Sequence, residues 1–181
     1  MNYIIFDLEA TCWKESQGRV SEIIEIGAVK LDSNIKVINE FNKFIKPVLN
    51  PELSDFCTTL TSIRQSDVDG AEFFETVIKD FEQWILLKSD RPVLLSWGYY
   101  DKDQLISECK HKHYKGPISK LLKKHYSLKH EYSRITRSRP CGMDQALQIL
   151  RIPLTGTHHR AIDDTRNITK IFERIHAKLN L

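Results

Sequence analysis

Three segments typical of β-strands occupy the first 46 residues of the chain. They cover residues 2–8, 22–31 and 36–46, and each is rich in β-branched or aromatic residues. The Asp32-Ser33-Asn34 sequence between the second and third segments is a turn signal, so these two strands should form an antiparallel hairpin. A chain that begins in this way must build its core against a β-sheet.

Further along, helical and strand-like segments alternate. A helix is expected over residues 72–85, with Phe73, Val77, Phe81 and Trp84 at helical spacing and Phe74, Ile78 and Ile85 beside them. The apolar run at 92–97 predicts a buried strand, and helices should follow over residues 101–110, 143–150 and 160–178. Antiparallel strands followed by this alternation predict an α/β fold with a mixed central sheet flanked by helices.

Length and composition limit the class of protein. A chain of 181 residues with 41% hydrophobic and 28% charged residues suits a single domain over residues 1–181. No apolar run approaches the roughly 20 residues that span a bilayer, and the N-terminus lacks signal-peptide features, so we expect a cytoplasmic protein without membrane contact. The four dispersed cysteines favour reduced thiols over a zinc site or a disulfide framework.

Positive charge is concentrated in residues 110–139, here called the basic segment, although the whole chain has a net charge of only +3. Ten Lys or Arg residues and one acid, Glu131, give the segment +9 and leave −6 for the rest. Tyr114, Tyr126 and Tyr132 are interleaved with the charges, which suits a polyanion such as nucleic acid. The alternative is a solvated basic loop without a partner.

Two acids follow the apolar run of the first strand. Side chains two residues apart share one face of a strand, so Asp7 and Glu9 should lie side by side near its C-terminal end. Two carboxylates this close repel each other unless a cation offsets the repulsion, and Mg²⁺ and Mn²⁺ prefer carboxylate oxygens. The alternative is a solvent-exposed acidic turn, although ligand sites in α/β sheets lie beyond the C-terminal ends of strands.

The last expected helix has an acid on its apolar face. Asp164 lies one turn before Ile168 on this face, where an acid needs a partner. The other residues of the face are Ile171, Phe172, Ile175 and Leu179. Its neighbour Asp163 aligns instead with the polar face of Asn167, Lys170 and Arg174. Helical phase favours Asp164 as the functional acid, and the alternative is that one of the two acids only caps the helix.

A fourth acid, Asp101, starts the helix that follows the strand at 92–97. It shares a helical stripe with Leu105 and Cys109, so it too should lie beyond the C-terminal end of a strand. The alternatives are that Asp101 is a capping residue, together with Gln104, or that Asp103 is the functional acid.

Two histidines precede Asp164 in the sequence GTHHRAIDD. An imidazole near a metal-bound water can take its proton. Spacing alone does not choose between His158 and His159, and a structural role at the helix start is the alternative.

Together, FDLEAT, SWGYYD and HRAIDD resemble the three exonuclease motifs of the DEDDh superfamily, which has an RNase H-like fold. His159 and Asp164 match its H-x-x-x-x-D signature. The segments EIIEIGAVKL, NPELSDFCTTLTSI and CGMDQAL are similar to the Eri-type branch, which includes the three-prime histone-mRNA exonuclease and KapD-like proteins. The resemblance covers nearly the whole chain.

This resemblance implies a 3′–5′ exonuclease that hydrolyses single-stranded nucleic acid, RNA in preference to DNA, and releases nucleoside 5′-monophosphates by a two-metal mechanism. It implies that His159 is the general base. It also implies that two Mg²⁺ or Mn²⁺ ions are held by Asp7, Glu9, Asp101 and Asp164.

The same resemblance implies four substrate contacts. Phe56 and Tyr100 would hold the 3′-terminal base, and the backbone of Ala10 and Thr11 would meet the terminal ribose. Aromatic stacking on a base contributes about 1–3 kcal/mol and tolerates any base. Apart from the resemblance, Phe56 would be interpreted as a core residue.

Eukaryotic members of this branch have an additional nucleic-acid-binding module ahead of the catalytic domain. The first strand is expected at residue 2 or 3, so we expect no such module here, and the basic segment would hold substrate phosphates instead. Other functions stay open: a non-catalytic nucleic-acid-binding module, a DNA-directed exonuclease, or a metal phosphatase acting on small nucleotides. The residues alone do not decide between RNA and DNA, and they leave the oligomeric state open.

Overall fold

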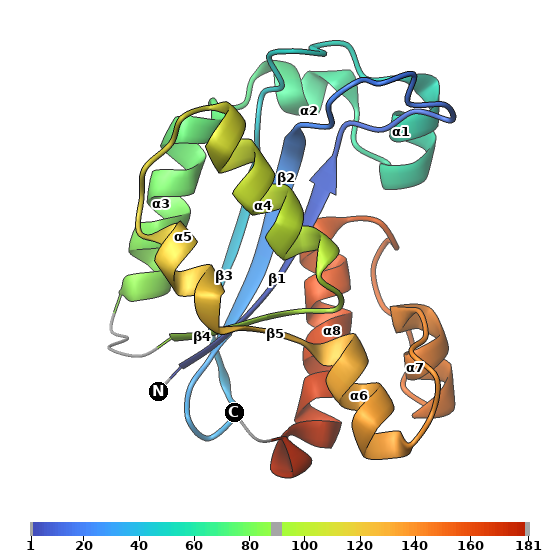
Figure 1. Cartoon of the computed structure of the whole chain (residues 1–181). Helices are drawn as coiled ribbons and strands as arrows, with labels where there is room; N and C mark the ends of the chain where they lie inside the picture. Colours follow the sequence, from blue (N-terminus) through green and yellow to red (C-terminus); the bar gives the residue numbers. More distant parts are fainter. Residues whose placement is uncertain (1, 88–91, 180–181) are drawn as a thin grey trace.

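The computed structural model describes residues 2–87 and 92–179. A five-stranded sheet of order β3-β2-β1-β4-β5 lies at its centre (Figure 1). The strands are β1 (Asn2–Ala10), β2 (Ile23–Leu31), β3 (Val37–Phe44), β4 (Pro92–Ser96) and β5 (His125–Ser127). The first three pair antiparallel, β4 pairs parallel with β1, and β5 pairs parallel with β4. The expected mixed sheet is confirmed.

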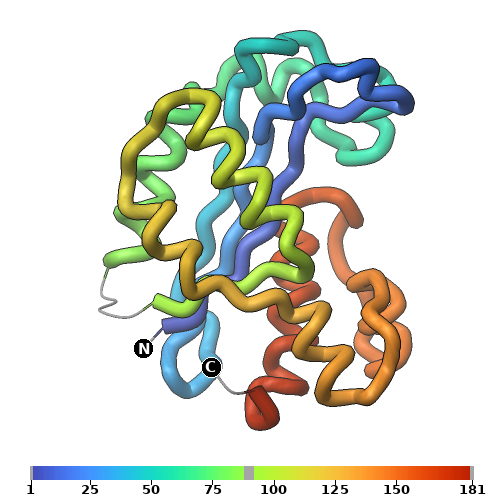
Figure 2. The backbone as a smooth tube through the Cα atoms, viewed as in Figure 1, coloured from blue at the N-terminus to red at the C-terminus, as the bar shows by residue number. Residues whose placement is uncertain are grey.

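Helices cover both faces of this sheet. One face packs against α3 (Phe74–Leu86), α4 (Tyr100–His111), α5 (Ile118–Leu121) and the 3₁₀ turn η1 (Leu122–Lys124). The opposite face packs against α6 (Leu128–Thr136), α7 (Met143–Ile149) and α8 (Ala161–Ile175). Successive side chains of a strand point to opposite faces. Alternate residues of β1 therefore pack against the helices of one face or of the other. The tube in Figure 2 shows the chain passing from α5 through β5 to α6.

Two short helices, α1 (Asp55–Thr61) and α2 (Gln65–Asp69), lie beyond the C-terminal end of β1 (Figure 1). A small apolar cluster of Ile24, Cys57, Ile63 and Val68 holds them there. The 3₁₀ turn η2 (His176–Lys178) follows α8. Across the described ranges, no helix combines the length and the apolar character needed to cross a membrane.

The longer expected elements are all present, with ends that differ from the expected ones by at most three residues. The elements that the sequence analysis did not expect are short: α1, α2, α5, η1, β5 and α6. Most of these segments contain too few turns or alternations for a periodic pattern, and α6 lies within the run of basic residues. The basic segment is therefore folded, and its interpretation as a solvated loop is wrong.

Three side chains differ from the expected pattern. Phe73 precedes the first turn of α3 and is 51% exposed, so the apolar stripe begins at Phe74. Trp84 is half-buried at the edge of the same cluster. Asn167 is fully buried rather than exposed, because its amide bonds the backbone of Thr155 and Asp163 and so anchors the loop before α8.

The N-terminal turn of α8 lies directly on the backbone of β2 at Gly27. A Cβ atom at this position would lie 2.3 Å from the carbonyl carbon of Ala161 and from the nitrogen of Ile162. The hydroxyl of Thr165 donates a hydrogen bond to the Gly27 carbonyl at 3.1 Å. Gly27 pairs with Asp7 across the sheet, so this contact holds the start of α8 over the second half of β1.

Replacing Gly27 by Ala should lower the free energy of unfolding by about 1–3 kcal/mol, because the methyl group displaces packed backbone. Gly70→Ala is the matched control, since nothing lies within 4 Å of its Cβ position and its φ is −88°. Denaturant unfolding measures both variants. A Gly27→Ala protein as stable as the Gly70→Ala protein would contradict the close packing of α8 on β2.

Candidate active site

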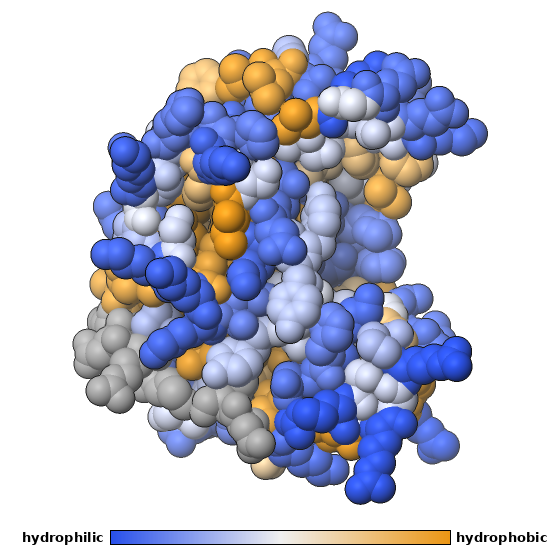
Figure 3. All heavy atoms as spheres, in the orientation of Figure 1, coloured by the Kyte–Doolittle hydropathy of each residue, from blue (hydrophilic) through white to orange (hydrophobic). Residues whose placement is uncertain are grey.

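An open pocket of about 450 Å³ lies where β1, α4, α7 and α8 meet. Its lining includes Asp7 and Glu9 from β1, Asp101 from α4 and Asp164 from α8. Because β1 and β4 run parallel, the end of β1 and the residues that follow β4 reach the same edge of the sheet. Figure 3 shows the molecule hollowed on one side, between the α1 region and the α6–α7 region.

Three of these carboxylates form a tight cluster. One oxygen from each of Asp7, Glu9 and Asp164 lies within 4.8 Å of the other two. Asp101 lines the same pocket outside this cluster, and its Oδ1 accepts a hydrogen bond from the Leu8 backbone N–H at 3.3 Å. By contrast, Asp103 is exposed on α4. The structure thus brings together the four acids that the sequence analysis selected.

Burial and repulsion from neighbouring carboxylates raise the pKa of all four carboxyl groups. Burial is the largest cause for each of them. The pKa of Asp7 lies well above its ordinary value, with Asp101 and then Glu9 adding to the effect of burial. The pKa of Glu9 rises to about 9, and those of Asp101 and Asp164 rise to about 6. Such a group is stabilised either by a proton or by a cation.

The cluster fits a divalent metal ion. The Oδ1 atom of Asp164 is buried and has no hydrogen-bond partner among the described residues, while its Oδ2 accepts the His159 backbone N–H at 3.0 Å. A free carboxylate oxygen beside two further carboxylates is the donor set that hard divalent cations prefer. The unpartnered oxygen therefore has a physical explanation in a bound cation.

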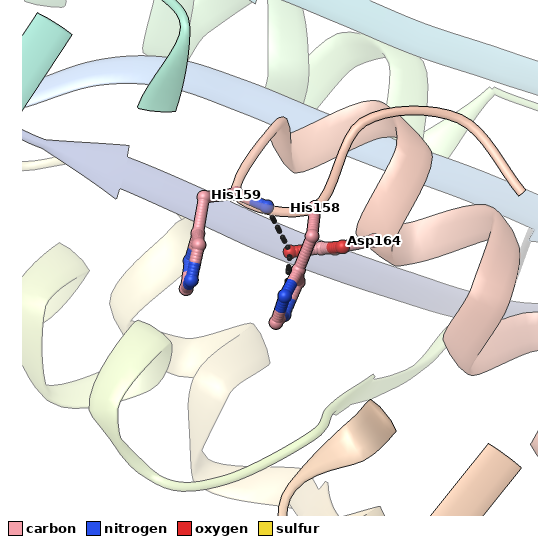
Figure 4. Close-up of side chains that lie close together, drawn as sticks. All are labelled: His158, His159 and Asp164. Carbon is pink, nitrogen blue, oxygen red and sulfur yellow. Dashed lines mark hydrogen bonds and ion pairs between the residues drawn. The ribbon is translucent and has the colours of Figure 1, made fainter. Parts of the chain in front are cut away.

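His158 and His159 lie beside the cluster, with both imidazole rings on the same side of the loop (Figure 4). The rings stack with centroids 4.0 Å apart, and the Nε2 atom of His158 is 3.9 Å from Asp164 Oδ2. The backbone of His159 is left-handed, with φ of 65°, and its N–H donates the hydrogen bond that Asp164 Oδ2 accepts. Burial, and then the charge of His158, lower the pKa of His159, which favours the neutral imidazole that a base requires.

A partly buried ion pair fixes the start of α8. The Nε and Nη2 atoms of Arg160 donate to the two carboxylate oxygens of Glu25, both at 3.1 Å. The backbone N–H of Ala161 donates to Glu25 Oε2 at 3.0 Å. Glu25 faces Glu9 across the sheet. The Arg160 guanidinium therefore neutralises the charge of Glu25, whereas the carboxyl group of Glu9 remains available to the pocket.

The four predicted substrate contacts lie in different surroundings. Tyr100 lines the pocket and is 59% exposed. Phe56 is 42% exposed on α1, so its interpretation as a core residue is wrong. Ala10 and Thr11 are buried at the end of β1, and the Thr11 hydroxyl accepts a hydrogen bond from the Glu22 N–H. Contact with a substrate stays a prediction for all four.

The lining also includes residues that the sequence analysis did not select. Among them are Trp97 after β4, Lys129 on α6, and Gly142, Met143 and Asp144 at the start of α7. Their signals were present, because Trp97 belongs to SWGYYD, Lys129 to the basic segment and the others to CGMDQAL. The indole N–H of Trp97 donates to the Cys141 carbonyl at 3.1 Å and joins two of these segments.

Curated relatives align along nearly the whole chain. ERI1 exoribonuclease 2 of Xenopus laevis is 33% identical over 193 residues, which cover 95% of this chain and 28% of the relative. ERI1 exoribonuclease 3 of Mus musculus is 31% identical over 185 residues, which cover 96% of this chain and 53% of the relative. The chain thus spans about a quarter to a half of the length of these relatives.

Solved structures match just as broadly. The nuclease domain of 3'hExo, a DEDDh family member bound to rAMP, has a TM-score of 0.90 and 29% identity, with 98% of this chain and 92% of that chain covered. A 3'-exonuclease structure on 3'-end specific recognition of histone mRNA stem-loop has a TM-score of 0.89 and 28% identity, with 96% and 63% covered. These matches confirm the expected RNase H-like fold.

A family model described as Exonuclease (RNase_T) matches residues 4–172, a span that contains every predicted catalytic residue. DEDDh exonucleases depend on divalent metal ions, and the carboxylate cluster of this chain suits one. The resemblance drawn from the three sequence motifs is therefore confirmed. The chain belongs to the RNase_T exonuclease family, in its DEDDh, Eri-type branch.

Proposed function

We propose that this chain is a metal-dependent exonuclease that shortens single-stranded RNA from its 3′ end and releases nucleoside 5′-monophosphates. The observation that carries the proposal is the cluster of Asp7, Glu9 and Asp164, with Asp101 and His159 in the same pocket. Relatives named exoribonucleases, and solved structures concerning rAMP and a histone mRNA stem-loop, support RNA over DNA. Residues 1–181 act as one catalytic domain in this proposal.

Two Mg²⁺ or Mn²⁺ ions would be held by Asp7, Glu9, Asp101 and Asp164. Bound ions of this kind stabilise the negative charge that develops on a phosphodiester and lower the pKa of water. Their charge would also offset the repulsion that raises the four carboxyl pKa values.

His159 takes the proton of the attacking water, which requires the neutral form that its lowered pKa provides. The hydrogen bond from the His159 N–H to Asp164 fixes the backbone that carries the imidazole. The attack breaks the bond between phosphorus and the O3′ atom of the penultimate nucleotide. The phosphate stays with the departing nucleoside as its 5′-phosphate.

Phe56 and Tyr100 hold the terminal base between them, and the backbone of Ala10 and Thr11 meets the terminal ribose. The large exposed fractions of both aromatic side chains support this role, because a stacking platform must be accessible. The proposal also includes a cytoplasmic location. All four cysteines are free thiols, as is usual in a reducing compartment.

The direct test is a gel of 5′-labelled single-stranded RNA, and of the matching DNA, with Mg²⁺, Mn²⁺ or EDTA. A ladder that shortens from the 3′ end with metal, and an intact strand in EDTA, are expected. An RNA strand that is bound but uncut in every condition would mean a binding module. Cleavage of a mononucleotide ester without cleavage of the strand would mean a phosphatase.

Asp101→Asn should reduce the rate of RNA degradation by about 100-fold or more, because a metal ligand is lost while the shape of the side chain is kept. Asp103→Asn is the matched control, since Asp103 is exposed on the first turn of the same helix. Single-turnover assays measure both rates, and circular dichroism checks that both proteins fold. Equal rates in the two variants would remove Asp101 from the site.

His159→Ala should slow cleavage by about 100- to 10,000-fold, the usual range for loss of a general base. His158→Ala should have a much smaller effect, although the His158 ring stacks on that of His159. The pH dependence of kcat/KM in the two variants provides the comparison. The reverse order of effects would assign the base to His158, whose Nε2 atom is 3.9 Å from Asp164.

Without metal, the stability of the protein should fall as pH rises from about 4 to 9. The folded protein holds protons on Glu9, Asp101 and Asp164 up to pKa values of about 9, 6 and 6, whereas the unfolded chain releases them near pH 4. The stabilisation is therefore present below pH 4 and is lost through this window. Thermal unfolding in EDTA measures the fall.

Mn²⁺ should restore stability at pH 9, since a ligand that binds the folded state stabilises it. Glu9→Gln should flatten the pH dependence in EDTA and weaken the effect of Mn²⁺. Unfolding temperatures that respond neither to pH nor to Mn²⁺ would count against a metal site at this cluster.

A further inference from the structure

The basic segment is divided between the two faces of the molecule. Its first part, α5 and η1, packs on the face of α3 and α4 through Ile118 and Leu122. Its second part, α6 and the turn that follows, packs on the opposite face through Leu128 and Tyr132. Figures 1 and 2 show α5 and α6 on opposite sides of the molecule, with only α6 near α7. The two parts therefore cannot hold one substrate in the same way.

The start of α6 belongs to the wall of the catalytic pocket. Lys129 lines the pocket, and its backbone N–H donates to the Trp97 carbonyl at 2.7 Å. The indole of Trp97 in turn donates to the Cys141 carbonyl at 3.1 Å. Gly142 lines the pocket as well. Lys129 and Gly142 thus lie along one side of the site, and the turn that begins at Arg137 leads from α6 to Gly142.

Arg137 and Arg139 extend the positive charge along this turn. Arg137 ends α6 in the left-handed conformation, with φ of 54°, and both arginines are exposed. Within the ranges that the structure describes, the side chains of Lys129, Arg137 and Arg139 have no ion pair or hydrogen bond. Arg134 on the same helix differs, because it pairs with Glu131 at 2.7 Å. Three positive charges, one in the pocket wall and two on the turn after α6, are therefore free to bind a ligand.

A strand whose 3′ end lies in the pocket has one phosphate per nucleotide outside it, and these phosphates must leave along one side. The lysines of α5 and η1 are exposed on the other face of the sheet, and no residue of α5 or η1 lines the pocket. Asp144 is the acid on the α7 side of the pocket, and it limits the positive surface in that direction. Lys129 is the one Lys or Arg among the described residues that line the pocket, so the α6 side favours a polyanion.

We propose that Lys129, Arg137 and Arg139 form a phosphate-binding wall that holds a nucleic-acid strand upstream of its 3′-terminal nucleotide. This inference rests on the proposed function, since it specifies how the same site holds its substrate. The lysines of α5 and η1 take no part. Contacts to phosphate read neither base nor sugar, so the wall serves RNA and DNA strands alike.

The test compares two triple variants that remove the same charge. The wall variant is Lys129→Gln, Arg137→Gln and Arg139→Gln. The control is Lys120→Gln, Lys123→Gln and Lys124→Gln, three exposed residues on the other face. Fluorescence anisotropy measures the binding of a 5′-labelled single strand of about 12 nucleotides in EDTA, where no cleavage is expected, over a range of salt concentrations.

The wall variant should bind at least about 10-fold more weakly at low salt. The slope of log K against the logarithm of the salt concentration should become less steep by about 2 units, because each of three phosphate contacts to a single strand contributes about 0.7. The control should keep the affinity and slope of the wild type. Equal losses in both variants, or wild-type binding by the wall variant, would overturn the proposal. Thermal unfolding checks the fold, and Arg137→Gln with Arg139→Gln against Lys123→Gln with Lys124→Gln repeats the comparison without Lys129.

Cleavage in Mn²⁺ separates this inference from the function on which it rests. A wild-type protein that binds through the wall in EDTA but leaves the strand uncut in Mn²⁺ would refute the exonuclease and keep the wall. A wild-type protein that cuts, together with a wall variant whose KM equals that of the control, would refute the wall and keep the exonuclease. We expect the KM of the wall variant to rise more than its kcat falls.

Discussion

The contact between α8 and β2 at Gly27 sets the geometry on which the site depends. Asp164 is on the first turn of α8, whereas Asp7 and Glu9 are on β1, so their separation is fixed by how closely the helix approaches the sheet. The absence of a side chain at Gly27 allows the backbone of Ala161 to lie on the strand. Any larger residue at this position would move one carboxylate away from the other two.

The Arg160–Glu25 pair determines the orientation of the same helix. Two hydrogen bonds from the guanidinium and one from the Ala161 N–H leave little rotational freedom to the first turn. A pair with one fully buried partner contributes little net stability, because desolvation of the charges opposes their attraction. Its role here is positional, since the residues on either side of it, His159 and Asp164, both face the pocket.

Two buried acids of this chain, Glu22 and Glu9, differ in how the fold treats their charge. Glu22 accepts hydrogen bonds from three backbone N–H groups and from Lys112. Burial acts to raise its pKa, but the hydrogen bonds and the ammonium group outweigh burial and the pKa is lowered. Glu9 is as well buried, yet its pKa rises to about 9. The first acid is satisfied by the fold, whereas the second requires a ligand.

The sequence predicted the side-chain positions that follow from the period of a strand or a helix. It did not predict the positions that depend on tertiary contacts. The strand period placed Asp7 and Glu9 together, and helical phase selected Asp164 over Asp163 and Asp101 over Asp103. Helical phase predicted that Asn167 is exposed. This prediction was wrong, because the Asn167 amide donates hydrogen bonds to backbone carbonyls at and near the loop before α8 and is buried. The charge count of the basic segment was correct, but a count cannot show that three residues of β5 carry the chain from one face of the sheet to the other.

The carboxylate cluster requires a cation, whereas the positively charged side of the pocket requires a polyanion. Without metal, Glu9 holds a proton at neutral pH, but Asp101 and Asp164, with pKa values of about 6, are ionised. These two carboxylates repel a phosphate that approaches within about 10 Å, the screening length at 0.1 M salt. The charges of Lys129, Arg137 and Arg139 attract the phosphates that lie further along a strand. A nucleic acid alone satisfies only the second requirement, and a metal ion alone satisfies only the first. Metal ions and a strand bound together satisfy both, so each should increase the affinity of the pocket for the other.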